Sequence, residues 1–598
     1  MRNEETRSIR EIFTRQETLF ILLVIIVGLL LRWLQLDARP IHHDESLHAI
    51  YGKYFYTDPN EKFYRYDPLL HGPVLYNLLP YFYQFLDVSK WAGRAMITCL
   101  GSLFIFIPFL FRRFLSKNTL ILLISFIALS PSLIFWSRFL REDFLVLSSM
   151  FLMFWGATIP QAKFRPVFFF TGLFLHFCIK ENSYVTLALL LGFLFYEQII
   201  CTFKHGKGNR SLLQKFFNVI KTHPYATLAG FIFAAFIFCF FYSSGFRYSE
   251  GILDGLYRKG FIYWLHQHNI DRIKGPFIFH FLSLAWYEFL FVIAFIWTTI
   301  HFYLKTNWKL QTLIVSGLVL AAILHLIYRN QTLELVPVFN VLKLKIGLDF
   351  YLFIFLVLHS IIVTSKHLLE NETGLAFWGY FFFASFFAYS FVGEKVPWLS
   401  LYPFVAGIFY IALYLQKTEL LDRMLTWTMP GGQLLFKPFF FAFLLVFNFR
   451  MALMTNFARA GDETEFISQV HTTKVYEQIL MDIQKEILFP KQGYIPHVLV
   501  LNDAIWPTTW YLFGLEGFNF IPPLDNNYEV YDYVVANVDN ETVEKALEKT
   551  PFRQVIPLRA WWVPNYDKMT IKNFLVYALT HNPWNDPGSY EVAYYKKK

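Results

Sequence analysis

The strongest sign of chemistry in this sequence is a run of ionisable residues directly after the first long apolar segment. Residues 41–46 read Ile-His-His-Asp-Glu-Ser, and the apolar run before them extends from Leu19 to Leu34. One interpretation is a solvated loop that leaves a helix. Ionisable side chains at the level of a membrane are costly to place, however, and usually mark a functional site. Asp44 and Glu45 are therefore the candidate catalytic residues.

Similar charged clusters recur at other predicted helix junctions, and all of them fall on the same side of the predicted membrane. Taken alone, each cluster has an ordinary interpretation as a polar turn. Their location on one face favours a common site. The candidate binding residues in these clusters are His43, His71, Arg138, Arg141, Glu142, Asp143, Lys180, Glu181, Glu394, Lys395 and Trp398.

These residue types suit the transfer of a group from a lipid phosphate. A carboxylate can act as general base toward a hydroxyl or amine acceptor. Arg and Lys can hold a phosphate, Arg through a two-pronged contact and Lys as a point charge. The additional carboxylates either neutralise these cations or bind a divalent metal ion, with Asp44, Glu142 and Asp143 as candidate ligands. We therefore expect sugar transfer from a polyprenyl-phosphate carrier to an acceptor.

Three motifs that would indicate other chemistry are absent from the sequence. It contains no D-x-D motif and no P-loop, which disfavours a nucleotide-linked donor from the cytosol. It also lacks H-E-x-x-H, the usual signature of a membrane zinc protease.

The elements that must position these clusters are membrane-spanning helices. Of 598 residues, 56% are hydrophobic and only 16% are charged, which is typical of a polytopic membrane protein. The net charge of +9 is spread over the loops, so no nucleic-acid partner is predicted. Hydropathy predicts about 13 spans, near 18–36, 91–111, 119–136, 142–159, 166–179, 183–202, 225–244, 278–301, 310–327, 340–364, 375–392, 399–416 and 438–455.

The distribution of Lys and Arg places the N-terminus inside. We expect a cytoplasmic leader (1–17), a transmembrane domain (18–455) with its first outer loop at 37–90, and an extracytoplasmic domain (456–598). The last part lacks a spanning run and alternates strand-like pieces with helix-like ones. This order predicts a small α/β domain outside the membrane.

Several of these runs resemble a known superfamily of membrane glycosyltransferases, GT-C. The match is nearest to glycosyltransferase family 39, which contains protein O-mannosyltransferases and aminoarabinose transferases, and to the "flippase activity-associated" family of bacteria and archaea. The runs that carry the resemblance are His43-Asp44-Glu45, Asp67-Pro68, His71-Gly72-Pro73, Arg141-Glu142-Asp143, Lys180-Glu181-Asn182, Gly393 to Trp398 and, more loosely, Arg559 to Pro564.

The resemblance implies an inverting transferase with Asp44 as general base and a dolichyl- or undecaprenyl-phosphate sugar as donor. The acceptor is a protein, a lipid or a glycan, and the membrane is the prokaryotic cell (inner) membrane. Some members of the superfamily bind a divalent metal near the first loop and others need none, so the metal stays open. Oligosaccharyltransferases carry W-W-D-Y-G, whereas here Trp561-Trp562 is followed by Val563-Pro564, a departure that argues against en bloc glycan transfer.

Two other interpretations account for parts of the pattern. A non-catalytic accessory or transporter in the flipping of lipid-linked glycans would place polar residues at the bilayer midplane, often with inverted repeats. The charges here are at helix ends instead, and no repeat is visible. A structural membrane anchor for the outer domain would need only one or two spans.

Overall fold

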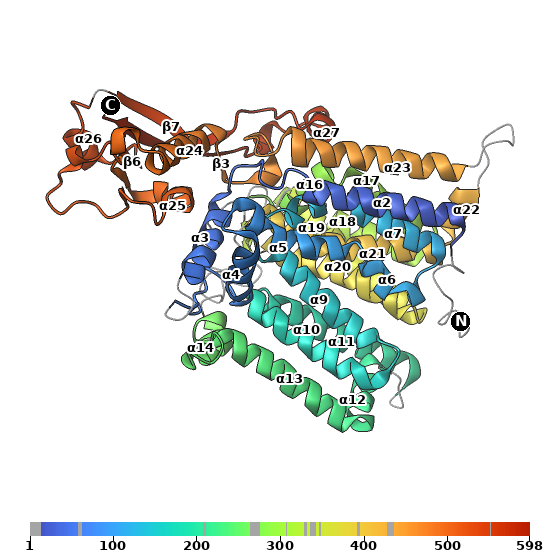
Figure 1. Cartoon of the computed structure of the whole chain (residues 1–598). Helices are drawn as coiled ribbons and strands as arrows, with labels where there is room; N and C mark the ends of the chain where they lie inside the picture. Colours follow the sequence, from blue (N-terminus) through green and yellow to red (C-terminus); the bar gives the residue numbers. More distant parts are fainter. Residues whose placement is uncertain are drawn as a thin grey trace.

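The structure is a computed structural model, and it describes residues 13–57, 62–206, 211–262, 275–306, 308–327, 332–334, 343–345, 348–391, 395–426, 436–550 and 552–597. Long helices lie side by side in one bundle, and the strands of the C-terminal part lie beyond one end of it (Figure 1). This arrangement confirms the predicted class: a helical chain that ends in a domain with a β-sheet.

The bundle is built from helices of very different lengths. Those of its first half are α2 (Arg15–Trp33), α3 (His43–Thr57), α4 (Val74–Leu86), α5 (Lys90–Phe104), α6 (Ile107–Leu110), α7 (Lys117–Leu129), α8 (Pro131–Ser137), α9 (Asp143–Thr158), α10 (Arg165–Ile179), α11 (Ser183–His205), α12 (Leu212–Thr222), α13 (Pro224–Tyr242) and α14 (Glu250–Leu253). Those of its second half are α16 (Phe279–Tyr287), α17 (Phe289–Leu304), α18 (Trp308–Ile327), α19 (Leu348–Leu369), α20 (Thr373–Phe391), α21 (Leu401–Lys417), α22 (Leu420–Thr426) and α23 (Phe436–Leu453).

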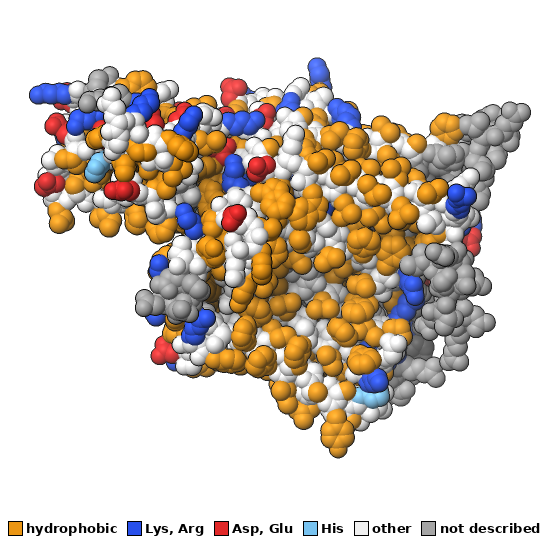
Figure 2. Space-filling view, viewed as in Figure 1, with side chains coloured by type: hydrophobic (Ala, Val, Ile, Leu, Met, Phe, Trp, Pro, Cys, Tyr) orange, Lys and Arg blue, Asp and Glu red, His pale blue; other side chains and the backbone are white. Residues whose placement is uncertain are grey.

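Within the described residues, six helices are long and apolar enough to cross a membrane, or up to eight if each of two bent pairs forms one span. The bent pairs are α7 with α8, at 54°, and α16 with α17, at 114°. Hydrophobic side chains cover much of the bundle surface in Figure 2, as expected of helices that face lipid. The count of 13 spans stays a prediction.

One expected span begins later than predicted. Strands β1 (Thr332–Glu334) and β2 (Lys343–Lys345) pair antiparallel, and α19 starts only at Leu348 rather than near residue 340. Strand β2 contains two lysines, Lys343 and Lys345, but their charges were averaged with the apolar residues that follow when hydropathy was taken over a whole span.

The C-terminal part contains a six-stranded mixed sheet in the order β3-β7-β8-β6-β4-β5. Its strands are β3 (His471–Thr472), β4 (Val498–Val500), β5 (Phe518–Asn519), β6 (Tyr533–Asn537), β7 (Phe552–Trp561) and β8 (Gly588–Lys596). Its helices are α24 (Lys474–Leu488), α25 (Ile505–Leu512), α26 (Glu541–Ala546) and α27 (Ile571–Thr580). The buried strands β4 and β6 pair in parallel, which requires the crossover that the alternating sequence pattern predicted.

The end of the bundle that faces this sheet is called here the sheet end. It carries the start of α3 and of α9 and the ends of α2, α8, α10, α20 and α23 (Figure 1). The C-terminal part contacts it directly: the ring of His42 hydrogen-bonds the carbonyl of Gln469, and Lys53 donates to the carbonyl of Phe513 at 2.8 Å. The C-terminal domain therefore contacts the first predicted junction and α3.

Candidate functional site

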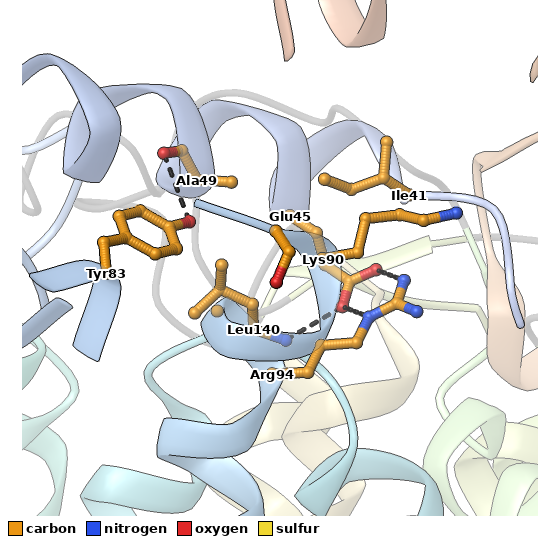
Figure 3. A pocket seen from close by; sticks show the side chains of 9 residues that line it. Ile41, Glu45, Ala49, Tyr83, Lys90, Arg94 and Leu140 are labelled. Carbon is orange, nitrogen blue, oxygen red and sulfur yellow. Dashed lines mark hydrogen bonds and ion pairs between the residues drawn. The ribbon is translucent and has the colours of Figure 1, made fainter. Parts of the chain in front are cut away.

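Glu45, in the first turn of α3, is the hub of a fully buried hydrogen-bond network. Its carboxylate accepts two hydrogen bonds from Arg94, at 2.9 and 2.7 Å, and one from Arg39 at 3.2 Å. The backbone N–H groups of Leu140 and His42 donate to it at 2.9 and 3.1 Å. Figure 3 shows the carboxylate facing the Arg94 guanidinium.

These contacts change the role expected for Glu45. Burial raises the pKa of this carboxyl group, but Arg94 and Arg39 bring the net pKa well below its usual range. Both oxygens are already occupied by donors, so the group ties the first loop to α5 and to the turn before α9. These contacts favour a positioning role for Glu45, and its catalytic role stays a prediction.

Asp44 lies on a different side of the same helical turn and remains accessible. Its side chain is 27% exposed, and Oδ2 accepts a short hydrogen bond from Arg141. Burial raises the pKa of Asp44, whereas Arg141, His42 and His43 together shift it well below its usual range. Asp44 is thus an ionised carboxylate with an open side.

Arg141 connects Asp44 to further charges at the start of α9. Its Nε lies 3.2 Å from Oδ2 of Asp143, and its guanidinium stacks on Trp398, with 3.7 Å between Cζ and the ring centroid. Oδ1 of Asp143 accepts hydrogen bonds from Lys180 at 2.8 Å and from Tyr402 at 2.6 Å. Residues from three separate junctions thus form one chain of alternating charge, and a fourth junction contributes the ring of Trp398.

Glu142 is the least satisfied group of the cluster. Both its carboxylate oxygens are buried and accept no hydrogen bond in the described structure. Nε2 of His48 is 3.4 Å from its Oε1, and Nδ1 of His48 is 2.5 Å from the hydroxyl of Tyr76, whereas Nε of Arg141 is 4.0 Å from its Oε2. Glu142 is therefore placed to keep His48 oriented toward the site.

The candidate metal ligands do not converge. The guanidinium of Arg141 lies within 4.0 Å of the carboxylates of Asp44, Glu142 and Asp143. In the described part of the chain, no three His, Cys, Asp or Glu residues lie close enough to hold a metal ion. The residues present do not fit a metal centre here.

A second charged group forms beside the cluster, between the first loop and the turn after α10. Nδ1 of His71 is 2.9 Å from Glu181, which also accepts a hydrogen bond from Tyr66 at 2.6 Å. Burial raises the pKa of Glu181, but His71 and Tyr66 bring it below its usual range. Gly72 lets the two segments touch: a Cβ there would lie 2.2 Å from the carbonyl oxygen of Cys178.

Arg138, a predicted phosphate-binding residue, directs its guanidinium toward backbone carbonyls, and its role in phosphate binding stays a prediction. Its guanidinium donates to the carbonyls of Leu31 and Leu34 at 2.7 Å each and to that of Gln35 at 3.0 Å. It also lies over the ring of Phe457, 4.6 Å from the centroid. The last carbonyls of a helix have no intrahelical donor, and Arg138 supplies one for α2. The Arg138 guanidinium therefore links the turn after α8 to the C-terminal end of α2.

Lys395 and Trp398 follow α20 at the sheet end, whereas Glu394 lies outside the described residues. The Lys395 ammonium is buried and donates to the carbonyl of Ser390, one helical turn beyond Phe386. Phe386 and Phe382 line an apolar cavity of about 240 Å³ between α16, α17, α19 and α20. The ammonium of Lys395 is therefore bound to α20 about one helical turn past the residues of that helix that line the apolar cavity.

Arg559, on β7, is a site residue that sequence reasoning did not select. It donates to the carbonyls of Asp503 and Trp506, and it forms no ion pair within the described residues. Burial and the charge of Arg559 lower the pKa of His43 to about 4. The only available signal was that Arg559 opens the run 559–564, one of those that resemble the family.

No family model matches the chain, and no curated protein matches it. Among solved structures, it is similar to ArnT from Cupriavidus metallidurans bound to undecaprenyl phosphate, with 12% identity, a TM-score of 0.44, and 97% of this chain and 98% of that chain covered. The apo state of the same protein gives 12% identity, a TM-score of 0.44 and 98% of both chains. The chain is also similar to the Archaeoglobus fulgidus oligosaccharyltransferase in complex with Zn and sulfate, with 13% identity and a TM-score of 0.38. That match covers 88% of this chain and 68% of that chain.

Proposed function

We propose that this chain is a membrane glycosyltransferase that moves a sugar from a polyprenyl-phosphate carrier to an acceptor at the sheet end of the bundle. The observation that carries the proposal is Asp44: an ionised, partly exposed carboxylate paired with Arg141, in a cluster whose other charged side chains are buried. The family resemblance of the same run of residues supports it.

The donor side is formed by Lys395 and the apolar cavity. A polyprenyl phosphate has a charged head and a long hydrocarbon chain, so it needs a cation directly beside an apolar channel. Phe382, Phe386 and Ser390 are spaced four residues apart and so share one face of α20. The cavity and the carbonyl that holds Lys395 therefore follow one another along that face, with the ammonium at the sheet end.

In the proposed reaction, Asp44 accepts the proton of the acceptor hydroxyl. The acceptor oxygen attacks the anomeric carbon from the face opposite the carrier phosphate, and the bond between that carbon and the phosphate oxygen breaks. The phosphate leaves with the electron pair, and the charges of Lys395 and Arg141 stabilise it. Attack from the opposite face inverts the anomeric centre.

The low pKa of Asp44 makes it a weak base in the ground state, and this is compatible with the step. Sugar transfer passes through an oxocarbenium-like transition state in which the anomeric carbon carries positive charge. The acceptor hydroxyl becomes acidic only as it bonds to that carbon, so its proton moves late. Until it accepts that proton, the ionised carboxylate of Asp44 also stabilises the positive charge on the anomeric carbon.

The acceptor side is proposed to include the C-terminal domain, residues 456–598. Trp506, at the start of α25, stacks beside Tyr51 of α3 with 6.5 Å between ring centroids. Arg559 lies next to Trp506, and its charge acts on both His43 and Asp44. Aromatic rings and a guanidinium beside the base suit a polar, ring-containing acceptor.

In this account residues 18–455 form the membrane domain, with the N-terminus inside and the sheet end outside a prokaryotic cell membrane. The six apolar helices support the membrane assignment, and the Lys and Arg distribution supports the orientation. The remaining predicted binding residues, Glu142, Asp143, Lys180, His71 and Glu181, would hold Arg141 and the first loop in place.

The test is a transfer assay with the purified full-length chain in nanodiscs. A panel of radiolabelled polyprenyl-phosphate sugars is supplied with membrane extract as acceptor, with and without divalent metals. The proposal expects one donor to be consumed and its label to appear in an acceptor fraction. If no donor is consumed under any metal condition, the accessory role replaces the enzymatic one.

A further inference from the structure

Helix α27 has two opposite faces, only one of which is used inside the protein. Tyr577 and Ala578 are buried, and the ring of Tyr577 lies 5.1 Å from Trp286 of α16 and 4.2 Å from Trp562. The other face presents Ile571, Leu575, Val576 and Leu579, with exposed fractions of 82%, 40%, 40% and 40%. Four aliphatic side chains on one exposed face of a ten-residue helix call for a partner.

Contacts with the end of α23 fix the position of α27 along the long axis of the bundle. Helix α23 is apolar, exposes Phe443 and Val446, and continues through the π-helical turn Met454–Ala458 into the C-terminal domain. Arg459, the next residue, donates to the carbonyl of His581 and to the side chain of Asn582, both at 2.6 Å. The C-terminal end of α27 is therefore tied to the point where α23 leaves the bundle.

Helix α16 fixes the other side of α27 at the same level. It meets α17 at an angle of 114°, so it lies across the bundle instead of along it. The hydroxyl of Tyr287, the last residue of α16, donates to Glu465 at 2.8 Å and lies 3.2 Å from the hydroxyl of Tyr577. Helix α27 is thus held at the sheet end, beside the end of α23 (Figure 1).

We propose that the exposed face of α27 is embedded in the outer leaflet of the membrane, at the boundary between headgroups and acyl chains. The aliphatic face continues the apolar surface of α23, which ends beside it. Lys568 and Lys572 are exposed on and next to α27 and can extend their ammonium groups to lipid phosphates while their stems stay with the apolar face. This combination is typical of interfacial helices.

The consequence is a second anchor for the C-terminal domain. The buried face of α27 packs through Tyr577 on Trp562, which directly follows β7, the strand that carries Arg559. A membrane contact at α27 would therefore fix the height of β7 above Asp44. The contact with lipid does not depend on the proposed transfer activity.

The experiment uses the full-length chain in nanodiscs of phosphatidylcholine and phosphatidylglycerol. The four native cysteines are replaced by serine, and one NBD fluorophore is attached at L575C or at L579C. A label at F443C, on the exposed surface of α23, reports lipid contact, and a label at K545C, exposed on α26, reports water. Each sample is compared in nanodiscs with plain and with brominated acyl chains.

The proposal expects the labels at 575 and 579 to be quenched by brominated lipid, as at 443, while the label at 545 is not. Labels at 575 and 579 that behave like the one at 545 would overturn it. So would labels that are shielded from water yet not quenched by brominated lipid, because the face would then be covered by protein, such as a second copy of the chain.

A measurement on the wild-type chain covers the case in which the cysteine-free variant does not fold. A phospholipid with a photoreactive diazirine in its upper acyl chain is incorporated into the nanodisc and illuminated. Mass spectrometry should find the lipid adduct on the peptide that contains residues 571–580 and not on the one that contains 541–546. Equal labelling of both peptides, or labelling of neither, would contradict the proposal.

Discussion

Replacing Glu45 by Gln should destabilise the fold rather than remove a reacting group. The carboxylate is fully buried and accepts hydrogen bonds from Arg94, Arg39, Leu140 and His42. Gln keeps one acceptor oxygen but turns an NH₂ group toward two buried guanidinium groups, which then lack a counter-charge. Removal of one partner from a buried ion pair costs about 3–5 kcal/mol.

The structure places the cost at the lower end of that range. Arg94 retains hydrogen bonds to three backbone carbonyls of the first loop, at 2.8, 3.0 and 3.1 Å, so part of its hydrogen-bonding capacity stays satisfied. We therefore expect Glu45→Gln to lower the free energy of unfolding by about 3 kcal/mol, roughly a hundredfold in the folding equilibrium.

The assay is unfolding of the protein in nanodiscs, followed by intrinsic fluorescence as denaturant or temperature rises. Glu544→Gln is the matched control, because Glu544 makes an exposed ion pair with Arg553 at 2.8 Å and such pairs contribute at most about 1 kcal/mol. If Glu45→Gln is as stable as this control and yet inactive in transfer, the positioning role is wrong and Glu45 takes part in the reaction.

Three further changes probe the cluster and its support. Arg141→Gln removes the cation that depresses the pKa of Asp44. Since an ionised Asp44 is required, the acid limb of the kcat/KM profile, which lies below about pH 4 in the wild type, should shift to higher pH, and an unshifted limb would show that another group controls it. Lys395→Ala should weaken transfer by about 2–4 kcal/mol and raise the KM for the donor, which unchanged donor kinetics would contradict. Gly72→Ala should destabilise the chain by about 1–3 kcal/mol in the same unfolding assay, because its Cβ would overlap the Cys178 carbonyl; wild-type stability would mean that the two segments separate readily.

The fold class follows from composition and hydropathy, because lipid-facing helices must be long and apolar. The bends do not. Pro131 opens α8 directly after α7, and Glu288 stands between α16 and α17, yet the apolar run continues through both points. Hydropathy measures how apolar a segment is and carries no information about its direction.

At the site, too, the sequence does not tell in which direction a single side chain points. The sequence selects Asp44 and Glu45 together, and the structure separates them because neighbours on a helix point about 100° apart. Arg138 and Arg141 were likewise grouped, but they lie in the turn between α8 and α9. In this turn Arg138 points toward α2 and Arg141 points toward Asp44. Which charge faces a cavity and which binds the backbone depends on tertiary contacts.

Some information about these contacts was nevertheless present. An arginine such as Arg94, in the first turn of a predicted span, must find a buried partner, and the only nearby carboxylates in the sequence were those of the first loop. Arg559 could not be found in this way, because it lies far along the chain and approaches the site only through the sheet.

The most direct test of the account compares Asp44→Asn with Asp37→Asn in the transfer assay. Asp37 is an exposed carboxylate of the same loop and serves as the matched control. The account predicts a loss of about 100- to 10,000-fold for Asp44→Asn, with donor binding retained, and wild-type transfer for Asp37→Asn. Transfer by Asp44→Asn at the wild-type rate would contradict the assignment of Asp44 as the base.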